Sequence, residues 1–149
     1  HVLEKAFSGV FDAILVDAPC SGESLFAKRG DHRVDVKDSE IERCSVRQAA
    51  ILKSASQMLK SSGRVLYSTC AYSREENEDV VSHFLSENPD FKLKHESRRY
   101  PHIDGVPGGY SALLSREGVS SSEGAQRDAD ESLRTINQAI QNQGVNGLI

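Results

Sequence analysis

Two short apolar runs in this chain each lead directly into small and polar residues. Phe11 to Val16 (FDAILV) is followed by Asp17-Ala-Pro-Cys-Ser-Gly22, and Arg64 to Thr69 (RVLYST) is followed by Cys70. A short, continuous apolar run bounded by turn residues is typical of a buried strand. The pattern therefore predicts two buried strands, each with candidate chemistry at its carboxyl end.

The segment between these strands has apolar residues at helical spacing. Ser39-x-x-Glu42 has the form of a capping box and predicts the helix start, and Gly63 predicts its stop. We expect a helix from about Ser39 to Leu59 that crosses between the strands. Its predicted buried face is Ile41, Cys44, Gln48, Leu52, Ala55 and Leu59.

A second helix is predicted after Cys70. Ser73-x-x-Glu76 is another capping box, and the acidic cluster from Glu75 to Asp79 is interpreted as favourable charge at the helix start. Asn88-Pro89 predicts the end of this helix. Its predicted buried stripe is Val80, Val81, Phe84 and Leu85.

Two further apolar segments, Phe91 to Leu93 and Tyr110 to Leu114, are candidates for the last strands, as an antiparallel pair. The alternation of strand and helix before them predicts an α/β fold, with parallel strands joined by right-handed crossover helices.

The predicted topology brings three reactive side chains together. A single helix joins the first two strands, so we expect them to be neighbours about 4.8 Å apart. Ligands of open α/β sheets bind beyond the carboxyl ends of the strands. Asp17, Cys20 and Cys70 should therefore lie on one rim, with two thiols within reach of one bound molecule. For Asp17 taken alone, a simple turn or N-cap role is the alternative.

Composition narrows the function classes. The chain has 149 residues, of which 38% are hydrophobic and 27% charged, a composition typical of a globular protein. Its net charge of −4 argues against a generally basic surface for nucleic acid. Its longest apolar stretches are too short to span a bilayer, so we expect no membrane association. The histidines match no metal-ligand spacing, and we expect no metal.

The three cysteines are an odd number without a CxxC spacing. This pattern disfavours a disulfide framework, a zinc site and a thiol redox motif. It predicts free thiols in a reducing cytoplasm, with Cys44 as a buried structural thiol.

The last aromatic residue is Tyr110, and the chain becomes polar soon after it. We expect a folded unit over residues 1–114, a disordered polar linker over 115–131, and a tail over 132–149 with one short amphipathic helix. The densest basic run, Lys92, Lys94, Arg98 and Arg99, is either a solvated edge or an edge that contacts phosphates.

At this point two motifs become recognisable. Asp17-Ala-Pro-Cys-Ser-Gly22 and Tyr67-Ser-Thr-Cys-Ala-Tyr-Ser-Arg-Glu-Glu-Asn-Glu78 resemble the two signature motifs of the Sun/Nop family of RNA cytosine-5 methyltransferases. Glu23, the segment Arg99-Tyr-Pro-His102 and Gly108-Gly109-Tyr110 resemble the bacterial ribosomal RNA branch typified by RsmF. The resemblance covers about residues 8 to 115.

The resemblance implies a Rossmann-like domain that uses S-adenosylmethionine and acts on RNA, with ribosomal RNA as the expected substrate. It implies that Cys70 is the nucleophile and that Cys20 assists release of the methylated product. Asp17 is expected against both cofactor and target base, and Pro19 against the cofactor. The chemistry suits these residue types, since a thiolate that adds to carbon 6 of cytosine activates carbon 5 toward a methyl group.

The family's glycine-rich cofactor loop lies upstream of the first motif, and nothing before Phe11 resembles it. We therefore interpret the chain as the carboxyl half of a methyltransferase domain. The alternatives are a non-catalytic fragment that binds RNA or a partner, a DNA cytosine methyltransferase with Cys20 as nucleophile, and a thiol redox protein.

Overall fold

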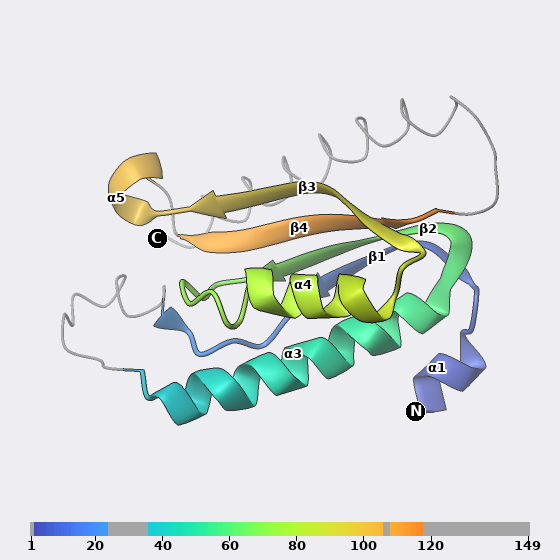
Figure 1. Cartoon of the computed structure of the whole chain (residues 1–149), viewed down its shortest axis with the longest axis horizontal. Helices are drawn as coiled ribbons and strands as arrows, with labels where there is room; N and C mark the ends of the chain where they lie inside the picture. Colours follow the sequence, from blue (N-terminus) through green and yellow to red (C-terminus); the bar gives the residue numbers. More distant parts are fainter. Residues whose placement is uncertain (1, 24–35, 106–107, 118–149) are drawn as a thin grey trace, which may run out of the picture. The chain divides into compact units, whose positions relative to one another are not determined.

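The computed structural model describes residues 2–23, 36–105 and 108–117. Within them a four-stranded sheet has the strand order β1-β2-β4-β3 (Figure 1). The elements are α1 (Val2–Ala6), β1 (Phe11–Asp17), α3 (Asp38–Met58), β2 (Leu59–Thr69), α4 (Glu78–Glu87), β3 (Phe91–Arg99), α5 (Pro101–Asp104) and β4 (Gly109–Arg116).

The predicted pairing of the strands is confirmed. β1 and β2 are parallel neighbours, with Ile14 opposite Val65 and Asp17 opposite Ser68, and α3 is the crossover helix between them. β3 and β4 pair antiparallel, and β4 also pairs antiparallel with β2. The described residues thus form a mixed α/β sheet in which a parallel pair is joined by a crossover helix, as the sequence pattern predicted.

The first helix lies within one residue of its predicted bounds, but the capping signals that predicted its ends do not hold. α3 begins at Asp38, and its N-cap Lys37 makes no side-chain capping bond, so the capping box at Ser39 is wrong. The helix ends at Met58 because Leu59 turns extended and enters the sheet opposite Phe11.

Gly63 is not the helix stop that we expected. It lies inside β2, where the pairing with β1 shifts register after Leu59. A Cβ atom on Gly63 would come within 2.9 Å of the Cβ atom of Leu59, so the irregular segment needs a residue without a side chain. Tertiary pairing therefore ends the helix before the glycine is reached.

The second helix starts later than predicted. α4 begins at Glu78 with Asn77 as its N-cap, and Ser73 does not cap it. The end at Asn88 is confirmed.

The last two strands are longer than the apolar segments that predicted them. β3 continues to Arg99 and β4 to Arg116, so the first two residues of the predicted linker belong to a strand. The rest of that linker from residue 118 and the predicted tail helix lie outside the described residues.

The hydrophobic core lies between the sheet and the two long helices. α3 and α4 cover the same face of the sheet (Figure 1). Leu52 from α3 and Phe84 from α4 are buried against Val65, Tyr67 and Leu114 of the sheet, and these burials dominate the stabilisation of the unit.

β1 is less buried than its apolar sequence predicted. Val16 is 6% exposed, but Leu15 is 57% and Phe11 38% exposed. The reason is its position, because β1 is an edge strand of the described sheet and the helices cover only one of its faces. Phe7 and Val10, which precede it, are also exposed large apolar residues.

Candidate functional site

The carboxyl ends of β1 and β2 meet as predicted. Ser68 Oγ donates to Asp17 Oδ1 at 3.2 Å, and the backbone N–H of Ala18 donates to the Ser68 carbonyl at 2.8 Å. Asp17 and Pro19 are both exposed at this rim. Asp17 therefore presents a carboxylate toward solvent from a fixed position, which is what a ligand at the rim requires.

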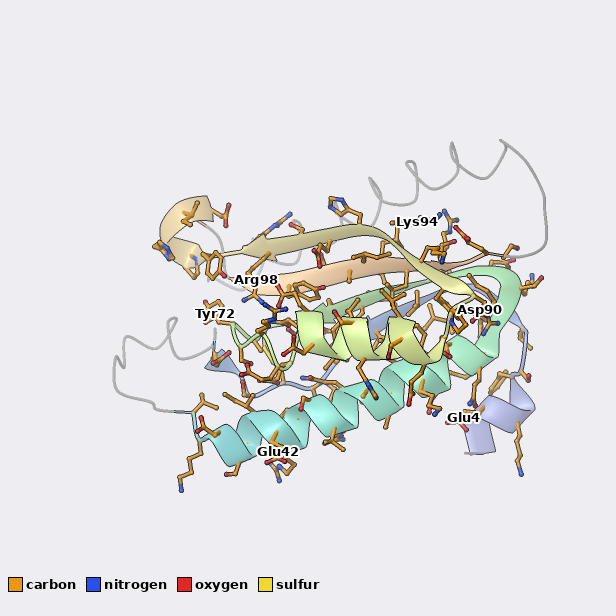
Figure 2. All side chains as sticks on the ribbon, viewed as in Figure 1. Glu4, Glu42, Tyr72, Asp90, Lys94 and Arg98 are labelled. Atoms are coloured by element: carbon orange, nitrogen blue, oxygen red, sulfur yellow. A yellow bond between two sulfur atoms is a disulfide. The ribbon has the colours of Figure 1, made fainter. Side chains whose placement is uncertain are left out.

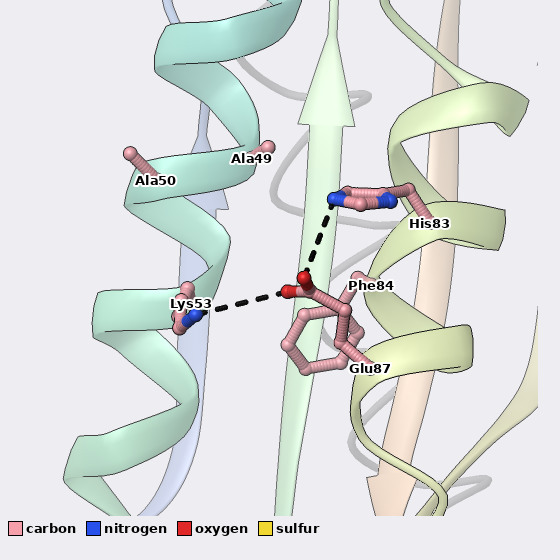
Figure 3. Close-up of a pocket in the computed structure, with 6 residues that line it drawn as sticks. All are labelled: Ala49, Ala50, Lys53, His83, Phe84 and Glu87. Atoms are coloured by element: carbon pink, nitrogen blue, oxygen red, sulfur yellow. Dashed lines mark ion pairs between the residues drawn. The ribbon is translucent and has the colours of Figure 1, made fainter.

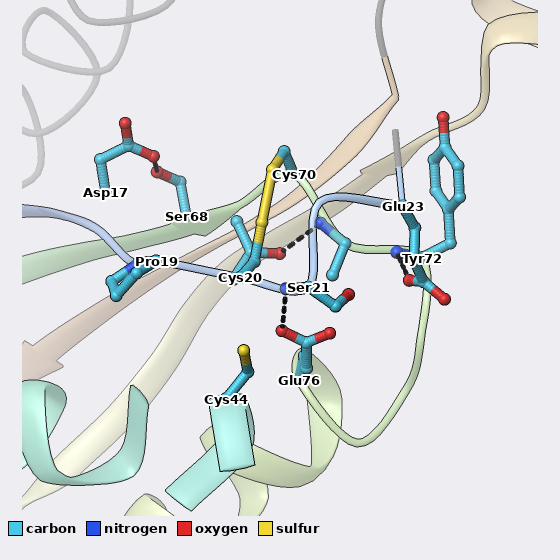
Figure 4. Close-up of a disulfide and its surroundings, with 12 residues drawn as sticks. Asp17, Pro19, Cys20, Ser21, Glu23, Cys44, Ser68, Cys70, Tyr72 and Glu76 are labelled. Atoms are coloured by element: carbon cyan, nitrogen blue, oxygen red, sulfur yellow. Dashed lines mark hydrogen bonds between the residues drawn. A yellow bond between two sulfur atoms is a disulfide. The ribbon is translucent and has the colours of Figure 1, made fainter. Parts of the chain in front are cut away.

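Cys20 and Cys70 come together at the same rim. Their Cα atoms are 6.4 Å apart, and their sulfur atoms are joined in a disulfide (Figure 4). The predicted convergence of the two thiols is thus confirmed, while the prediction that they are free is wrong for this structure. The two cysteines are 50 residues apart, and nothing in the sequence indicated that they pair. They pair because the ends of two parallel strands meet at one edge of the sheet.

Cys44 is the free cysteine of the described residues; it is half-buried on α3, not fully buried as predicted. Burial raises the pKa of its thiol, and the nearby carboxylates of Glu76 and Glu40 raise this pKa further. A thiol held protonated in this way is a poor nucleophile. This agrees with a structural role.

The loop after Cys70 is held by one buried amide. Asn77 is fully buried, and its Nδ2 donates to the carbonyls of Ala71 at 3.1 Å and Ser73 at 2.7 Å. Its Oδ1 accepts from the hydroxyl of Thr69 at 2.5 Å. Asn77 thus closes the loop that begins at Cys70 back onto the end of β2.

Glu76 is also fully buried, and it does not serve as a capping residue. Its Oε1 accepts from the backbone N–H of Ser21 at 2.9 Å (Figure 4). The same oxygen accepts from Nε2 of Gln48 at 2.8 Å, and Oε2 accepts from the Ser73 hydroxyl at 3.1 Å. Gln48 Nε2 also donates to the Pro19 carbonyl at 3.0 Å. One carboxylate therefore joins the first motif, the second motif and α3.

Glu23 makes the converse connection. Its Oε2 accepts from the backbone N–H groups of Tyr72 and Ser73, the latter at 2.7 Å. In the sequence, Glu23 belongs only to a motif resemblance and Glu76 fits a helix-capping box, so neither residue was predicted to join the two loops. The usable signal was Gln48, because a polar residue on an apolar helix face must find a buried partner.

Glycines allow β4 to approach the second motif. A Cβ on Gly109 would lie 2.7 Å from the Thr69 carbonyl oxygen, and one on Gly108 would lie 2.9 Å from the Arg99 carbonyl oxygen and close to the Tyr72 ring. Only glycine fits at such distances. The Gly108-Gly109 pair therefore lets the start of β4 lie against the loop that carries Cys70.

The residues of the basic run on β3 do not all have the same environment. Arg98 pairs with Glu78 and donates to the Tyr72 carbonyl, so it is a structural residue beside the rim (Figure 2). Lys92 and Lys94 are exposed toward the opposite end of β3, and Lys94 pairs with Glu117 at 3.3 Å. Lys92 and Lys94 thus match a solvated edge, and a contact with phosphate stays a prediction.

A shallow groove between α3 and α4 offers no comparable chemistry. It is lined by Ala49, Ala50, Lys53, His83, Phe84 and Glu87 (Figure 3). Lys53 of α3 and Glu87 of α4 pair across it at 3.7 Å, and His83 lies 3.8 Å from Glu87 on the same helix. No group of residues suited to a metal ion occurs in the described ranges. Nor does any helix described here have the length and apolarity needed to cross a membrane.

Solved structures share this fold. The chain is similar to PH0851, with a TM-score of 0.69 and 32% identity over 73% of this chain and 27% of that one. It is also similar to NSun6 from Pyrococcus horikoshii, solved with SFG, with a TM-score of 0.61 and 28% identity over 71% of this chain and 30% of that one. The sheet and its rim are those of a Rossmann-like methyltransferase.

The family follows from the sequence match. The family described as 16S rRNA methyltransferase RsmB/F matches residues 2–113. The chain belongs to this family, which confirms the resemblance seen in the two motifs.

Two curated relatives show how much of such a protein the chain spans. A probable ribosomal RNA small subunit methyltransferase B of Bacillus subtilis is 39% identical over 82 residues, which are 55% of this chain and 18% of the relative. A ribosomal RNA small subunit methyltransferase F of Shewanella piezotolerans is 40% identical over 81 residues, 54% of this chain and 17% of the relative. The chain thus spans less than a fifth of the length of either relative.

Proposed function

We propose that this chain is the nucleophile-bearing part of an S-adenosylmethionine-dependent enzyme that methylates carbon 5 of a cytosine in ribosomal RNA. The observation that carries the proposal is the meeting of Cys20, Cys70 and Asp17 at one sheet rim. Family membership supports RNA methylation, and the relatives named as methyltransferases of the small ribosomal subunit support ribosomal RNA as the substrate.

The rim offers one wall of a cofactor site. Asp17 and Pro19 are exposed beyond the end of β1, where ligands of such sheets bind. A carboxylate that accepts hydrogen bonds, close to a proline ring, fits a ligand that has both hydrogen-bond donors and a flat ring. S-adenosylmethionine, of which the SFG bound to the NSun6 relative is an analogue, would supply an electrophilic methyl group there.

The rest of the cofactor site would come from protein outside the described residues. The outer edge of β1 pairs with no strand of the described sheet, and apolar residues are exposed beside it, Leu15 among them. The relatives are also several times longer than their match to this chain. These observations support a chain that acts as one half of a larger catalytic domain.

The proposed reaction starts from the reduced pair. A thiol reductant gives two electrons and two protons to the disulfide, and Cys20 and Cys70 become thiols. We assign Cys70 as the nucleophile. Its thiolate adds to carbon 6 of the cytosine, and the electron pair of the 5,6 double bond makes carbon 5 nucleophilic toward the methyl carbon.

The second thiol completes the turnover. Once carbon 5 carries the methyl group, its proton must leave as the bond from carbon 6 to the Cys70 sulfur breaks. Cys20, having first lost its own thiol proton to solvent, accepts that proton as a thiolate, directly or through a water. The electron pair of the broken carbon–hydrogen bond forms the 5,6 double bond again, and Cys70 leaves as a thiolate. Asp17, which accepts a hydrogen bond from Ser68 at the same rim, would act on the base as the protonated acid, by donating to its ring nitrogen while negative charge develops there. A reduced thiol pair fits a cytoplasmic enzyme.

Methyl transfer tests the proposal. The full-length product of the gene is incubated with radiolabelled S-adenosylmethionine and small-subunit ribosomal RNA, and the RNA is digested to nucleosides. Label in 5-methylcytidine supports the proposal, while label in another nucleoside or in DNA only would contradict it. A protein that binds RNA without transfer would instead be the non-catalytic fragment.

A further inference from the structure

We propose that Glu23 and Glu76 form a reciprocal carboxylate clamp that positions the two cysteine-bearing loops against each other. Each carboxylate belongs to one loop and binds the backbone of the other. Glu23 follows the first motif and accepts from Tyr72 and Ser73 of the second. Glu76 lies in the second motif and accepts from Ser21 of the first.

The two halves of the clamp flank the cysteines. Ser21 N–H, held by Glu76, is adjacent to Cys20, and Tyr72 N–H, held by Glu23, is two residues beyond Cys70. The clamp therefore fixes backbone next to each sulfur and not only the general position of the loops (Figure 4).

A third element anchors the clamp to the core. Gln48, fully buried on α3, donates both to Glu76 Oε1 at 2.8 Å and to the carbonyl of Pro19 at 3.0 Å. Since Pro19 precedes Cys20, the first loop is held on both sides of its cysteine. Hydrogen bonds to an ionised carboxylate are the stronger kind, and burial of Glu76 makes them costly to break.

The clamp deepens the proposed function, and its role in catalysis rests on that function. Two thiols that act in turn on adjacent atoms of one base must stay within a few ångströms of each other through the turnover. Glu23 and Glu76 touch neither base nor cofactor in this account. They are positioning residues for Cys20 and Cys70.

The thiol pair itself reports this positioning. In a glutathione redox buffer, the equilibrium between dithiol and disulfide gives the effective concentration of one thiol at the other. The experiment uses the 149-residue chain with Cys44→Ser, so that only Cys20 and Cys70 remain. The fraction oxidised is measured by mass spectrometry after acid quenching and alkylation, and folding is checked by circular dichroism and thermal melting.

Replacement of either Glu23 or Glu76 by alanine should hold the Cys20 and Cys70 thiols less firmly together. We expect Glu23→Ala and Glu76→Ala each to lower the effective concentration about tenfold or more. Glu23→Gln and Glu76→Gln retain an acceptor oxygen and should stay within about threefold of the parent. Glu75→Ala, an exposed neighbour of Glu76, should change nothing.

A further control separates positioning from stability. Phe91→Leu opens the core at the opposite end of the sheet and should lower the melting temperature without changing the thiol equilibrium. If Glu76→Ala does not fold, Glu23→Ala alone decides the matter. Folded alanine variants of both residues with the parent's effective concentration, or a parent chain that forms no disulfide, would overturn the clamp. No methyl transfer enters this measurement, so a failure of the proposed function leaves its outcome unaffected.

Discussion

The Cα atoms of Cys20 and Cys70 lie 6.4 Å apart, although 50 residues of chain separate them. The two residues follow neighbouring parallel strands, and the carboxyl ends of such strands share one edge of the sheet. The fold therefore places the cysteines of the two motifs within reach of one bound molecule. The proposed two-thiol mechanism rests on this placement.

Alkylation should separate the three cysteines. The chain treated with iodoacetamide under native conditions without reductant should take up label at Cys44 only, because Cys20 and Cys70 are joined. After reduction with dithiothreitol, all three should react, with Cys44 the slowest near neutral pH because its pKa is raised. Peptide mass spectrometry measures this. Equal labelling of three cysteines without reductant would contradict the disulfide.

The buried amide of Asn77 should contribute strongly to stability. Asn77→Ala removes one acceptor and two donor contacts and leaves buried loop carbonyls without their donor, so we expect a loss of about 2–3 kcal/mol in the free energy of unfolding. Asn88→Ala, which removes one contact to the Phe84 carbonyl, is the matched control and should cost about 1 kcal/mol. Urea unfolding measures both. A smaller loss for Asn77 than for Asn88 would show that the loop does not depend on this amide.

The sequence predicted the architecture where its local pattern and the rules of topology lead to the same structure. The parallel pair, its crossover helix and the rim with Asp17, Cys20 and Cys70 follow from apolar runs and handedness alone, and the structure confirms them. The predicted stop at Gly63 was wrong because Leu59 turns extended and enters the sheet before the glycine is reached.

The clamp residues could not be predicted for a similar reason. Ser73-x-x-Glu76 satisfies a local helix signal, and no local pattern shows that Ser21 and Gln48 lie within reach of the Glu76 carboxylate. That arrangement depends on contacts between positions 28 and 55 residues apart, which exist only in the folded chain. The disulfide was missed for the same reason.

The chain alone should bind S-adenosylmethionine weakly. Asp17 and Pro19 form one wall of the proposed site, and the described residues offer no glycine-rich loop after a strand to hold the rest of the ligand. Isothermal titration calorimetry of the 149-residue chain should give no saturable heat, while a full-length relative serves as the positive control. Tight, saturable binding by this chain would contradict its assignment as one half of the domain.

Separate replacement of the two cysteines tests the two-thiol mechanism. In the full-length product of the gene, under reducing conditions, Cys70→Ala should abolish both methyl transfer and covalent RNA capture, because no nucleophile remains for carbon 6. Cys20→Ala should still attack and methylate but release slowly. A nuclease-sensitive protein–RNA band should therefore accumulate on a denaturing gel.

The reverse result, with an adduct trapped by Cys70→Ala and lost in Cys20→Ala, would exchange the two roles and favour a mechanism like that of the DNA enzymes. We expect the adduct in Cys20→Ala alone. Unchanged activity in both variants would contradict the two-thiol mechanism and return both cysteines to a structural role.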